Sequence, residues 1–317
     1  MKLKILFHDN CFDGAASAAL FSRFYRERCE PSALVEYLGV QHRPGDAFPP
    51  GAFDGDVNAC VDFRYSPSPR LDWWFDHHVS AFQSPDDREH FVRDRGGHKF
   101  YDPTARSCTK FEAQILADVF GFDIRPFGEL IDWADVIDGA QFPDARTAVA
   151  LEAPALQIMT WVETNKDPAA AIRLIEDLQT RSIGDIAADD YIQKPLVPVL
   201  SRHQQVIDVI HDRARAKDGV VFFDLVDAGI DAHNKFIAYM LFPECRYTVG
   251  ITRSPSRVKI SVGSNPWSGV PRTHNLAEIC ERHGGGGHPV VGAISLAPDQ
   301  VDRARAIASD IVKELST

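Results

Sequence analysis

The sequence predicts an α/β fold with a mostly parallel sheet, followed by a second, smaller α/β domain. Short apolar segments alternate with helical segments over the first 120 or so residues, and this alternation is typical of a parallel sheet with helices on both faces. Helical stretches then dominate from about 126 to 216. A chain of 317 residues is long for one hydrophobic core, which also indicates two domains.

Four short apolar segments predict the strands of the first domain, at residues 2–7, 33–40, 57–61 and 72–76. Helices are expected near 13–28 and 106–120, and the run Ala15–Phe21 is small and apolar, which favours a helix packed closely on a sheet. The Pro/Gly-rich segment 41–55 predicts a surface loop. The charged segment 86–98 predicts a solvated loop, with a flap as the alternative.

A connecting helix is expected between the two domains. The segment from Pro195 to Arg215 predicts this helix, with the proline at its start, and Gly219 opens a new apolar strand. We therefore expect the first domain at residues 1–190, a linker helix at 191–217 and the second domain at 218–317.

Candidate metal ligands follow the predicted strands, at or near the point where each apolar segment ends. In open α/β sheets, ligands bind at the carboxyl ends of the strands. Mixed oxygen and nitrogen donors gathered there are typical of a two-metal hydrolytic site. The residues are His8, Asp13, Asp62, Asp76, His77 and an aspartate near position 135.

The triplet Asp76-His77-His78 follows the apolar run 71–75 and offers two imidazoles and a carboxylate from one short segment. Such donors are accepted by Mn²⁺, Fe²⁺, Co²⁺ or Zn²⁺. Because side chains alternate along a strand, His77 and His78 are expected to point to opposite sides. One of them then binds metal while the other faces the substrate or a neighbouring ligand.

Four consecutive glycines, Gly284–Gly287, stand between His283 and His288. Each would cost roughly 1 kcal/mol relative to alanine inside a helix. Glycine instead lets backbone N–H groups approach a phosphate or sugar closely, and His288 adds a donor beside them. The alternative is a flexible turn between a helix at 275–282 and a strand at 290–296. Arg253 is a candidate phosphate clamp, with a surface ion pair as its alternative.

Composition narrows the class of protein. The chain has a net charge of −11, and residues 1–190 hold 19 Lys and Arg against 32 Asp and Glu. This acidic half fits a cation-binding domain and argues against a protein that grips long duplex nucleic acid. No segment has the ~20 apolar residues needed to cross a bilayer. The six cysteines form no CxxC pair and the start has no signal-peptide pattern, so a reduced, cytoplasmic protein is expected.

The chain resembles a DHH-family phosphoesterase with a DHHA1-type C-terminal domain. The resemblance is carried by His8…Asp13-Gly14, Asp62, Asp76-His77-His78, Ala134-Asp135-Val136 and the glycine-rich segment with Arg253 before it. It implies a parallel-sheet DHH domain joined by a helical linker to a smaller α/β DHHA1 domain. It also implies two divalent ions, with Mn²⁺ expected and Fe²⁺, Co²⁺ or Zn²⁺ compatible with the same donors.

The resemblance assigns roles to individual residues. His8 and Asp13 would hold one ion, His77 and Asp135 the other, and Asp62 would bridge them and help activate a water. Asp76 and His78 are the catalytic candidates, with Asp76 orienting a histidine and His78 donating to the phosphate. In the second domain, Gly285, Gly286, Gly287, His288 and Arg253 would bind the nucleotide end of the substrate.

The first motif departs from the better-known family pattern, in which two aspartates stand two residues apart. Here only Asp13 is present, with Cys11 and Ala15 two residues to either side. Asp9 and Asn10 are candidates to replace the missing carboxylate. Cys11 is a softer alternative ligand, although a cysteine more often simply packs. The choice among Asp132, Asp135 and Asp138 is also open, and Asp135 matches the family segment best.

The function expected from the resemblance is hydrolysis of phosphodiester or phosphomonoester bonds in short oligonucleotides or small nucleotides. This covers the nanoRNase, cyclic-dinucleotide and bisphosphate-nucleotide classes. The alternatives are a RecJ-like single-strand exonuclease, a pyrophosphatase or polyphosphatase, and a nucleotide-binding sensor with an impaired metal site. The sequence leaves the exact substrate, RNA versus DNA, cleavage polarity and the oligomeric state open.

Overall fold

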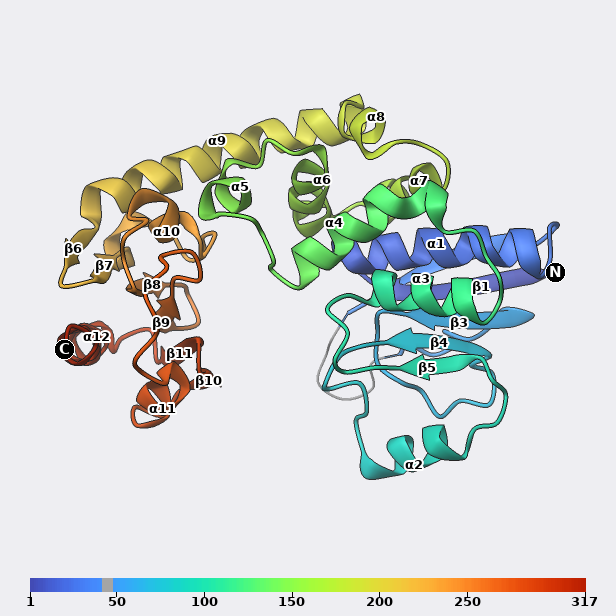
Figure 1. Cartoon of the computed structure of the whole chain (residues 1–317), viewed down its shortest axis with the longest axis horizontal. Coiled ribbons are helices and arrows are strands. Elements are labelled where there is room, and N and C mark those ends of the chain that lie inside the picture. The colour runs from blue at the N-terminus through green and yellow to red at the C-terminus, as the bar shows by residue number, and fades with distance from the viewer. Residues whose placement is uncertain (42–47) are drawn as a thin grey trace. The chain divides into compact units, whose positions relative to one another are not determined.

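The computed structural model describes residues 1–41 and 48–317 (Figure 1). The predicted surface loop at 41–55 therefore lies partly outside the described residues. The chain forms two compact units. The first unit comprises residues 1–142 and 152–196, and the second unit comprises 143–151 and 197–317.

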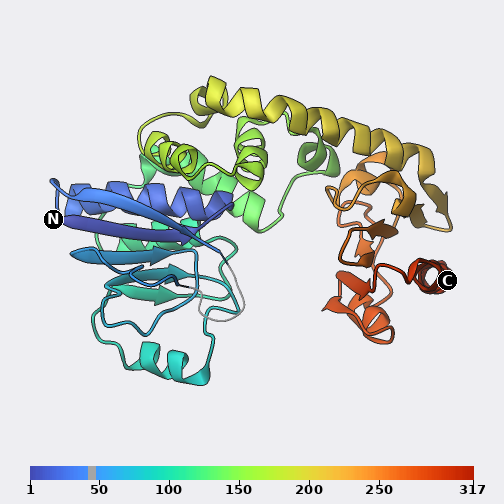
Figure 2. The same cartoon turned by 180° about the vertical axis from the view of Figure 1, so that it is seen from behind.

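The first unit contains a five-stranded sheet in which every described strand pairing is parallel. The strand order is β2-β1-β3-β4-β5, seen from opposite sides in Figures 1 and 2. The bounds are β1 (Lys2–His8), β2 (Leu34–Val40), β3 (Val57–Val61), β4 (Trp73–Asp76) and β5 (Lys99–Tyr101). The predicted fold class and its first four strands are confirmed.

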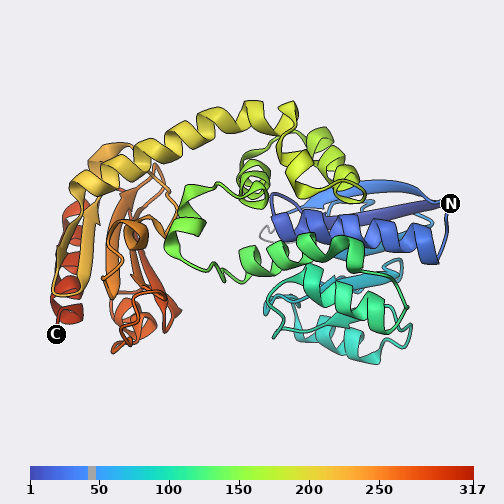
Figure 3. The same cartoon turned by 45° about the horizontal axis from the view of Figure 1, so that its top comes forward.

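Helix α1 (Phe12–Arg28) covers one face of this sheet and is almost entirely buried. A Cβ atom on Gly14 would lie 2.2 Å from the carbonyl oxygen of His8, so only glycine allows α1 to begin this close to β1. Helices α3 (Cys108–Asp118), α4 (Gly128–Asp138) and α7 (Pro168–Leu178) pack against α1, and Figure 3 shows α1, α3 and α4 together.

Because side chains alternate along β4, each face of the sheet receives one of its two tryptophans. Trp73 packs edge-on against Phe21 and Phe24 of α1. Trp74 points to the opposite face, where it contacts Tyr65 and Phe91. The two aromatic clusters fix the end of β4 from both sides. The triplet Asp76-His77-His78 starts at that end.

Residues 85–93 form a helix, α2 (Pro85–Arg93), where the sequence predicted a solvated loop or a flap. The helix starts with a capping box, in which the Ser84 hydroxyl accepts from the Asp87 amide and the Asp87 carboxylate accepts from the Ser84 amide. Its Phe91 reaches the core, which explains why a charged segment is ordered here. The first unit also contains η1 (Arg125–Phe127), α6 (Pro154–Thr164) and α8 (Ile183–Ala187).

The second unit contains a six-stranded sheet of order β10-β11-β9-β8-β7-β6, antiparallel except between β7 and β8. The strands are β6 (Arg215–Lys217), β7 (Val220–Asp224), β8 (Tyr247–Arg253), β9 (Val258–Ser264), β10 (Gly286–His288) and β11 (Val291–Leu296). One hydrophobic cluster lies between this sheet and helices α11 (Leu276–Glu281) and α12 (Val301–Leu315), and a second cluster includes Val221 and Phe223 of β7.

Helix α9 (Asp190–Arg213) begins in the first unit and ends in the second. It starts five residues before Pro195, the residue at which the sequence predicts the helix to begin. The remaining elements of the second unit are α5 (Ala145–Ala150), η2 (Val226–Ala228) and α10 (Ile237–Leu241). Among the described residues, no helix is both long and apolar enough to cross a membrane.

Candidate metal centre

The candidate site lies at the carboxyl ends of the central strands of the first unit. His8 ends β1, Asp62 directly follows β3, and Asp76 ends β4. The chain runs from β1 outward to β2 and then crosses back to β3 on the other side of β1. Between β1 and β3 the direction of winding therefore reverses, and open α/β sheets bind ligands at such a switch point.

Asp62 is the centre of the site. Its side chain is 1% exposed, and neither carboxylate oxygen has a hydrogen-bond partner among the described residues. Its φ of +54° is in the left-handed region, which is rare for a residue other than glycine and is concentrated at functional sites. Burial alone would raise the pKa of Asp62, but the nearby imidazoles of His77 and His8 lower it to about 2.

His77 presents Nε2 to three carboxylates. This atom lies 3.5 Å from Oδ1 of Asp62, 3.8 Å from Oδ2 of Asp13 and 3.4 Å from Oδ2 of Asp138. On the other side of the ring, Nδ1 donates to the carbonyl of Ala105 at 3.0 Å. That bond selects the tautomer whose Nε2 lone pair is available to a metal, as is usual for metal-binding histidines.

The carboxylates of the site repel one another. Burial and then the charge of Asp62 raise the pKa of Asp13 well above its usual range, and the same two causes raise that of Asp138. For His77, burial lowers the pKa but the surrounding carboxylates and the Ala105 carbonyl raise it to about 10. The site thus requires positive charge, which a proton on His77 or a bound cation supplies.

Asp13 is held in place by the start of α3. Its Oδ2 accepts from the amide of Cys108 at 2.6 Å and its Oδ1 from the amide of Thr109 at 3.0 Å. These are free amides of a helix N-terminus, which stabilise a carboxylate by hydrogen bonding and by the helix dipole. This support could not be predicted from the sequence, because Cys108 and Thr109 are distant from Asp13 in the chain and have no distinctive side-chain pattern.

Asp76 orients the two histidines that follow it. Its Oδ1 accepts from the amide of His77 at 2.8 Å, the amide of His78 at 3.2 Å and Nδ1 of His78 at 2.7 Å. Burial lowers the pKa of His78, but the Asp76 carboxylate outweighs this and raises it. Asp76 therefore orients His78 and favours its protonated form.

The expectation that His77 and His78 point to opposite sides is wrong. Their ring centroids are 4.7 Å apart, and a nitrogen of each lies within 4 Å of Oδ1 of Asp62. Strand β4 ends at Asp76, so strand alternation no longer applies to the two residues that follow. The Asp76 carboxylate instead turns both amides toward itself.

In α4, the structure brings Asp138 to the site in place of Asp135. Oδ2 of Asp135 pairs with Lys110 at 2.8 Å and Arg106 at 2.9 Å. Asp138 is the last residue of α4, one turn further along, and lies with Asp13 and His77. The sequence offered both residues at helical spacing but contained no signal that Asp135 was already neutralised by two cations.

Among the described residues, three groups have donor atoms close enough together to hold a metal ion. They are His8/Cys11/Asp62, Asp62/His77/His78 and Asp13/His77/Asp138, and within each group the donor atoms lie within 4.8 Å of one another. Asp62 belongs to two groups and so does His77. Ligands about 2.1 Å from one ion lie roughly 3.0 to 3.4 Å apart. Of the separations around Nε2 of His77, that to Asp138 (3.4 Å) falls in this range, and those to Asp62 (3.5 Å) and Asp13 (3.8 Å) are slightly longer.

The predicted substrate-binding residues lie in the second unit. Arg253 is exposed at the end of β8. Gly286–His288 form strand β10, which pairs with β11, and a Cβ on Gly287 would lie 2.2 Å from the carbonyl of Val291. The amides of Gly284 and Gly285 donate to carbonyls of α11. The glycine-rich segment is therefore a helix cap followed by a strand, rather than a flexible turn.

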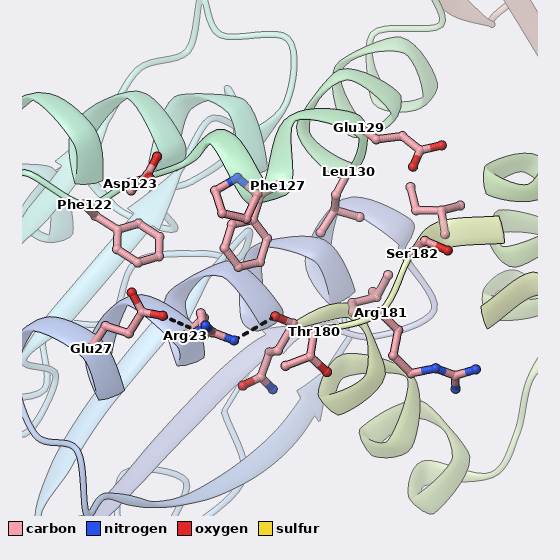
Figure 4. A pocket seen from close by; sticks show the side chains of 14 residues that line it. Arg23, Glu27, Phe122, Asp123, Phe127, Glu129, Leu130, Thr180, Arg181 and Ser182 are labelled. Atoms are coloured by element: carbon pink, nitrogen blue, oxygen red, sulfur yellow. Dashed lines mark hydrogen bonds and ion pairs between the residues drawn. The ribbon is translucent and has the colours of Figure 1, made fainter. Parts of the chain in front are cut away.

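A pocket of about 480 Å³ in the first unit lies away from these residues, near the far end of α1 (Figure 4). Phe122, Phe127 and Leu130 line it together with Arg23 and Glu27. Figure 4 shows that Arg23 is already paired with Glu27 and donates to a backbone carbonyl of the chain. None of the metal-site residues lines this pocket, so it is not the candidate site.

No family model and no curated protein matches the chain. Solved structures do match it. The pGpG-specific phosphodiesterase PggH from Vibrio cholerae aligns over 99% of both chains at 19% identity, with a TM-score of 0.69. A DHH-domain protein described as a member of a family of ribosomal proteins aligns over 100% of this chain and 87% of its own at 11% identity, with a TM-score of 0.59. The chain has the DHH fold.

RecJ from Thermus thermophilus in complex with Mn²⁺ shows the same DHH fold. It aligns over 99% of this chain at 12% identity, with a TM-score of 0.52. The aligned region is 52% of the RecJ chain, so this protein spans about half the length of that exonuclease. A second structure of the same RecJ contains Mg²⁺.

Proposed function

We propose that this protein is a divalent-metal-dependent phosphoesterase of the DHH family that hydrolyses short oligonucleotides or small nucleotides. The proposal is carried by the environment of Asp62. Asp62 is a buried carboxylate with a lowered pKa, no hydrogen-bond partner among the described residues, and a place in two potential metal-binding groups. A buried charge without a hydrogen bond is costly. Protonated imidazoles, whose nitrogens lie 3.4 to 3.8 Å from the carboxylate, or a bound cation would offset that cost.

The donor set fits two divalent ions. Asp13, His77 and Asp138 would hold one ion, His8 would hold the other, and Asp62 would be shared between them. Oxygen-rich donors with imidazole suit Mn²⁺, and Fe²⁺, Co²⁺ and Zn²⁺ accept the same atoms. When bound, such ions supply Lewis acidity and make a water nucleophilic near neutral pH.

The protein's own residues position the reacting groups. The Ala105 carbonyl holds His77 in its metal-binding tautomer, and the α3 amides hold Asp13. Protonated His78 would donate from Nε2 to a phosphate oxygen while Nδ1 donates to Asp76. This charge-assisted bond would strengthen as negative charge builds up on the phosphate in the transition state.

Two observations favour a small nucleotide over long nucleic acid. Residues 1–190 hold 19 Lys and Arg against 32 Asp and Glu, and this negative balance disfavours binding of a long phosphate backbone. PggH, whose name specifies the linear dinucleotide pGpG, aligns with this chain over 99% of both chains. In RecJ, by contrast, only 52% of the chain is aligned. We propose Arg253, Gly286, Gly287 and His288 as contacts for the nucleotide part of the substrate.

The six cysteines are all free thiols, which supports placing the protein in a reducing compartment such as the cytoplasm.

A panel of substrates with Mn²⁺ tests the proposal. It contains pGpG, a 5-mer, a single-stranded 24-mer, cyclic di-AMP, adenosine 3′,5′-bisphosphate and pyrophosphate. Turnover of a dinucleotide or 5-mer well above that of the 24-mer is expected. Preference for the 24-mer would instead favour a RecJ-like exonuclease. Nucleotide binding without turnover of any substrate would favour a sensor, the alternative motivated by the missing aspartate in the first motif.

A further inference from the structure

Cys11 occupies the N-cap position of α1, but its side chain does not cap the helix. N-cap positions usually hold a residue whose side-chain oxygen accepts from the first amides of the helix. The Cys11 side chain makes no such bond, and a donor atom of Cys11 lies within 4.8 Å of donor atoms of His8 and Asp62. The sulfur therefore faces the site.

Other cysteines of the first unit behave differently. The thiols of Cys60 and Cys108 are fully buried and approach backbone carbonyl oxygens, at 3.9 Å from Arg64 and 3.4 Å from Phe75. These two thiols pack as small hydrophobic groups with a weak donor. Cys11 is partly exposed and stands among a histidine and a carboxylate, which is the environment of a ligand.

Asp62 gives independent evidence that something binds between these groups. Its side chain is 1% exposed, and neither of its oxygens has a hydrogen-bond partner among the described residues. His8 lies on one side, with Nδ1 3.4 Å from Oδ2 of Asp62, and His77 lies on the other, with Nε2 3.5 Å from Oδ1. The carboxylate thus has one oxygen directed to each half of the centre.

We propose that Cys11 is a thiolate ligand of the ion held by His8 and Asp62. The inference rests on the proposed metal centre and makes its two halves chemically different. One half contains sulfur, nitrogen and oxygen donors, and the other half, Asp13/His77/Asp138, contains two carboxylates and an imidazole. Thiolate favours Zn²⁺, Co²⁺ or Fe²⁺, whereas the oxygen-rich half suits Mn²⁺ or Mg²⁺. On coordination the S–H bond is replaced by an S–metal bond, and the proton passes to solvent.

Cobalt substitution tests the proposal without relying on activity. The full chain is loaded with Co²⁺, the bound metal is counted, and the near-ultraviolet spectrum is scanned for sulfur-to-cobalt charge transfer. The band is expected in the wild type and in Cys29→Ser, a control that removes an exposed thiol at the other end of the same helix. It is expected to be absent from Cys11→Ser. Circular dichroism confirms that each variant is folded.

Metal preference provides a second readout. Cys11→Ser is expected to weaken Zn²⁺ binding at this half by at least about tenfold. Cys11→Asp restores an oxygen donor and is expected to shift the preference from Zn²⁺ toward Mn²⁺ while two ions still bind. Retention of the wild-type preference in Cys11→Asp would overturn the proposal.

The outcomes separate this inference from the proposed function. The role of Cys11 would be overturned, and the metal centre left in place, by either of two results. One is a wild type that binds two Co²⁺ ions without a sulfur-to-cobalt band; the other is an unchanged band in Cys11→Ser. Failure of the wild type to bind any Co²⁺, Zn²⁺ or Mn²⁺ would overturn both.

Discussion

Nε2 of His77 lies 3.5 Å from Oδ1 of Asp62, and neither buried atom has a hydrogen-bond partner among the described residues. Two polar groups that merely stabilised the fold would approach to about 2.9 Å and share a proton. The observed separation is close to that of two ligands on one ion. The backbone fixes both groups, since Asp62 follows β3 with a positive φ and His77 is anchored through Nδ1 to Ala105.

Removal of the metal is expected to destabilise the first unit. Bound ions neutralise the repulsion among Asp13, Asp62 and Asp138, and a ligand present at 100 times its Kd adds about 2.7 kcal/mol to the free energy of unfolding. For a unit of this size that corresponds to roughly 5 to 10 °C in Tm. Thermal unfolding with Mn²⁺ and with excess chelator measures the difference. An unchanged Tm would show that no metal binds the folded chain.

Asp138→Asn is expected to reduce kcat by at least about 100-fold and to weaken metal binding, because it removes a charged ligand next to His77. Asp135→Asn is the matched control in the same helix. It breaks ion pairs with the half-exposed side chains of Arg106 and Lys110 and is expected to cost about 1 kcal/mol or less of stability. Its activity should stay within a few-fold of the wild type. Loss of activity and metal binding in Asp135→Asn but not in Asp138→Asn would show that Asp135 is the ligand.

Stability of the metal-free protein is expected to fall as the pH rises from about 6.5 to about 10. The pKa of His77 is raised from 6.5 to about 10, so the folded chain keeps a proton that the unfolded chain loses in this range. Its stabilising contribution is complete below 6.5 and disappears as the pH passes 10. The difference in Tm between metal-loaded and metal-free protein should therefore widen with pH. His77→Gln should abolish this widening. A wild type in which the Tm difference between metal-loaded and metal-free protein is equal at pH 6.5 and pH 9.5 would contradict the prediction.

Gly287→Ala is expected to destabilise the second unit. Gly287 has a φ of +152°, and a Cβ there would lie 2.2 Å from the carbonyl oxygen of Val291. A strained backbone of this kind costs on the order of 1–3 kcal/mol. Gly286→Ala is the control, because nothing lies within 4 Å of its added Cβ. Thermal unfolding of both variants measures the difference, and equal Tm values would show that β10 tolerates a side chain at 287.

The strands and most of the site could be predicted from the sequence because both depend on local patterns. Apolar runs ending in His8, Asp62 and Asp76 place those residues at one edge of a parallel sheet. In the structure His8 and Asp62 share a potential metal-binding group, and Nδ1 of His78 lies close to both Asp62 and Asp76. The support from Ala105 and from the start of α3 could not be predicted, because backbone groups leave no signature in the sequence.

The differences between prediction and structure have local causes as well. The charged composition of residues 86–98 predicts a loop, whereas the capping-box spacing of Ser84 and Asp87 indicates the start of helix α2. Asp135 matches the family segment best, but the sequence does not show that neighbouring cations neutralise it.

Asp62 is proposed to organise a metal centre that hydrolyses a phosphodiester. The most direct test is hydrolysis of pGpG by the wild type and by Asp62→Asn, each with Mn²⁺ and with chelator. We expect turnover by the wild type that requires the metal and falls by at least about 1000-fold in a folded Asp62→Asn protein. Turnover by Asp62→Asn close to that of the wild type, or turnover that persists in chelator, would contradict the account.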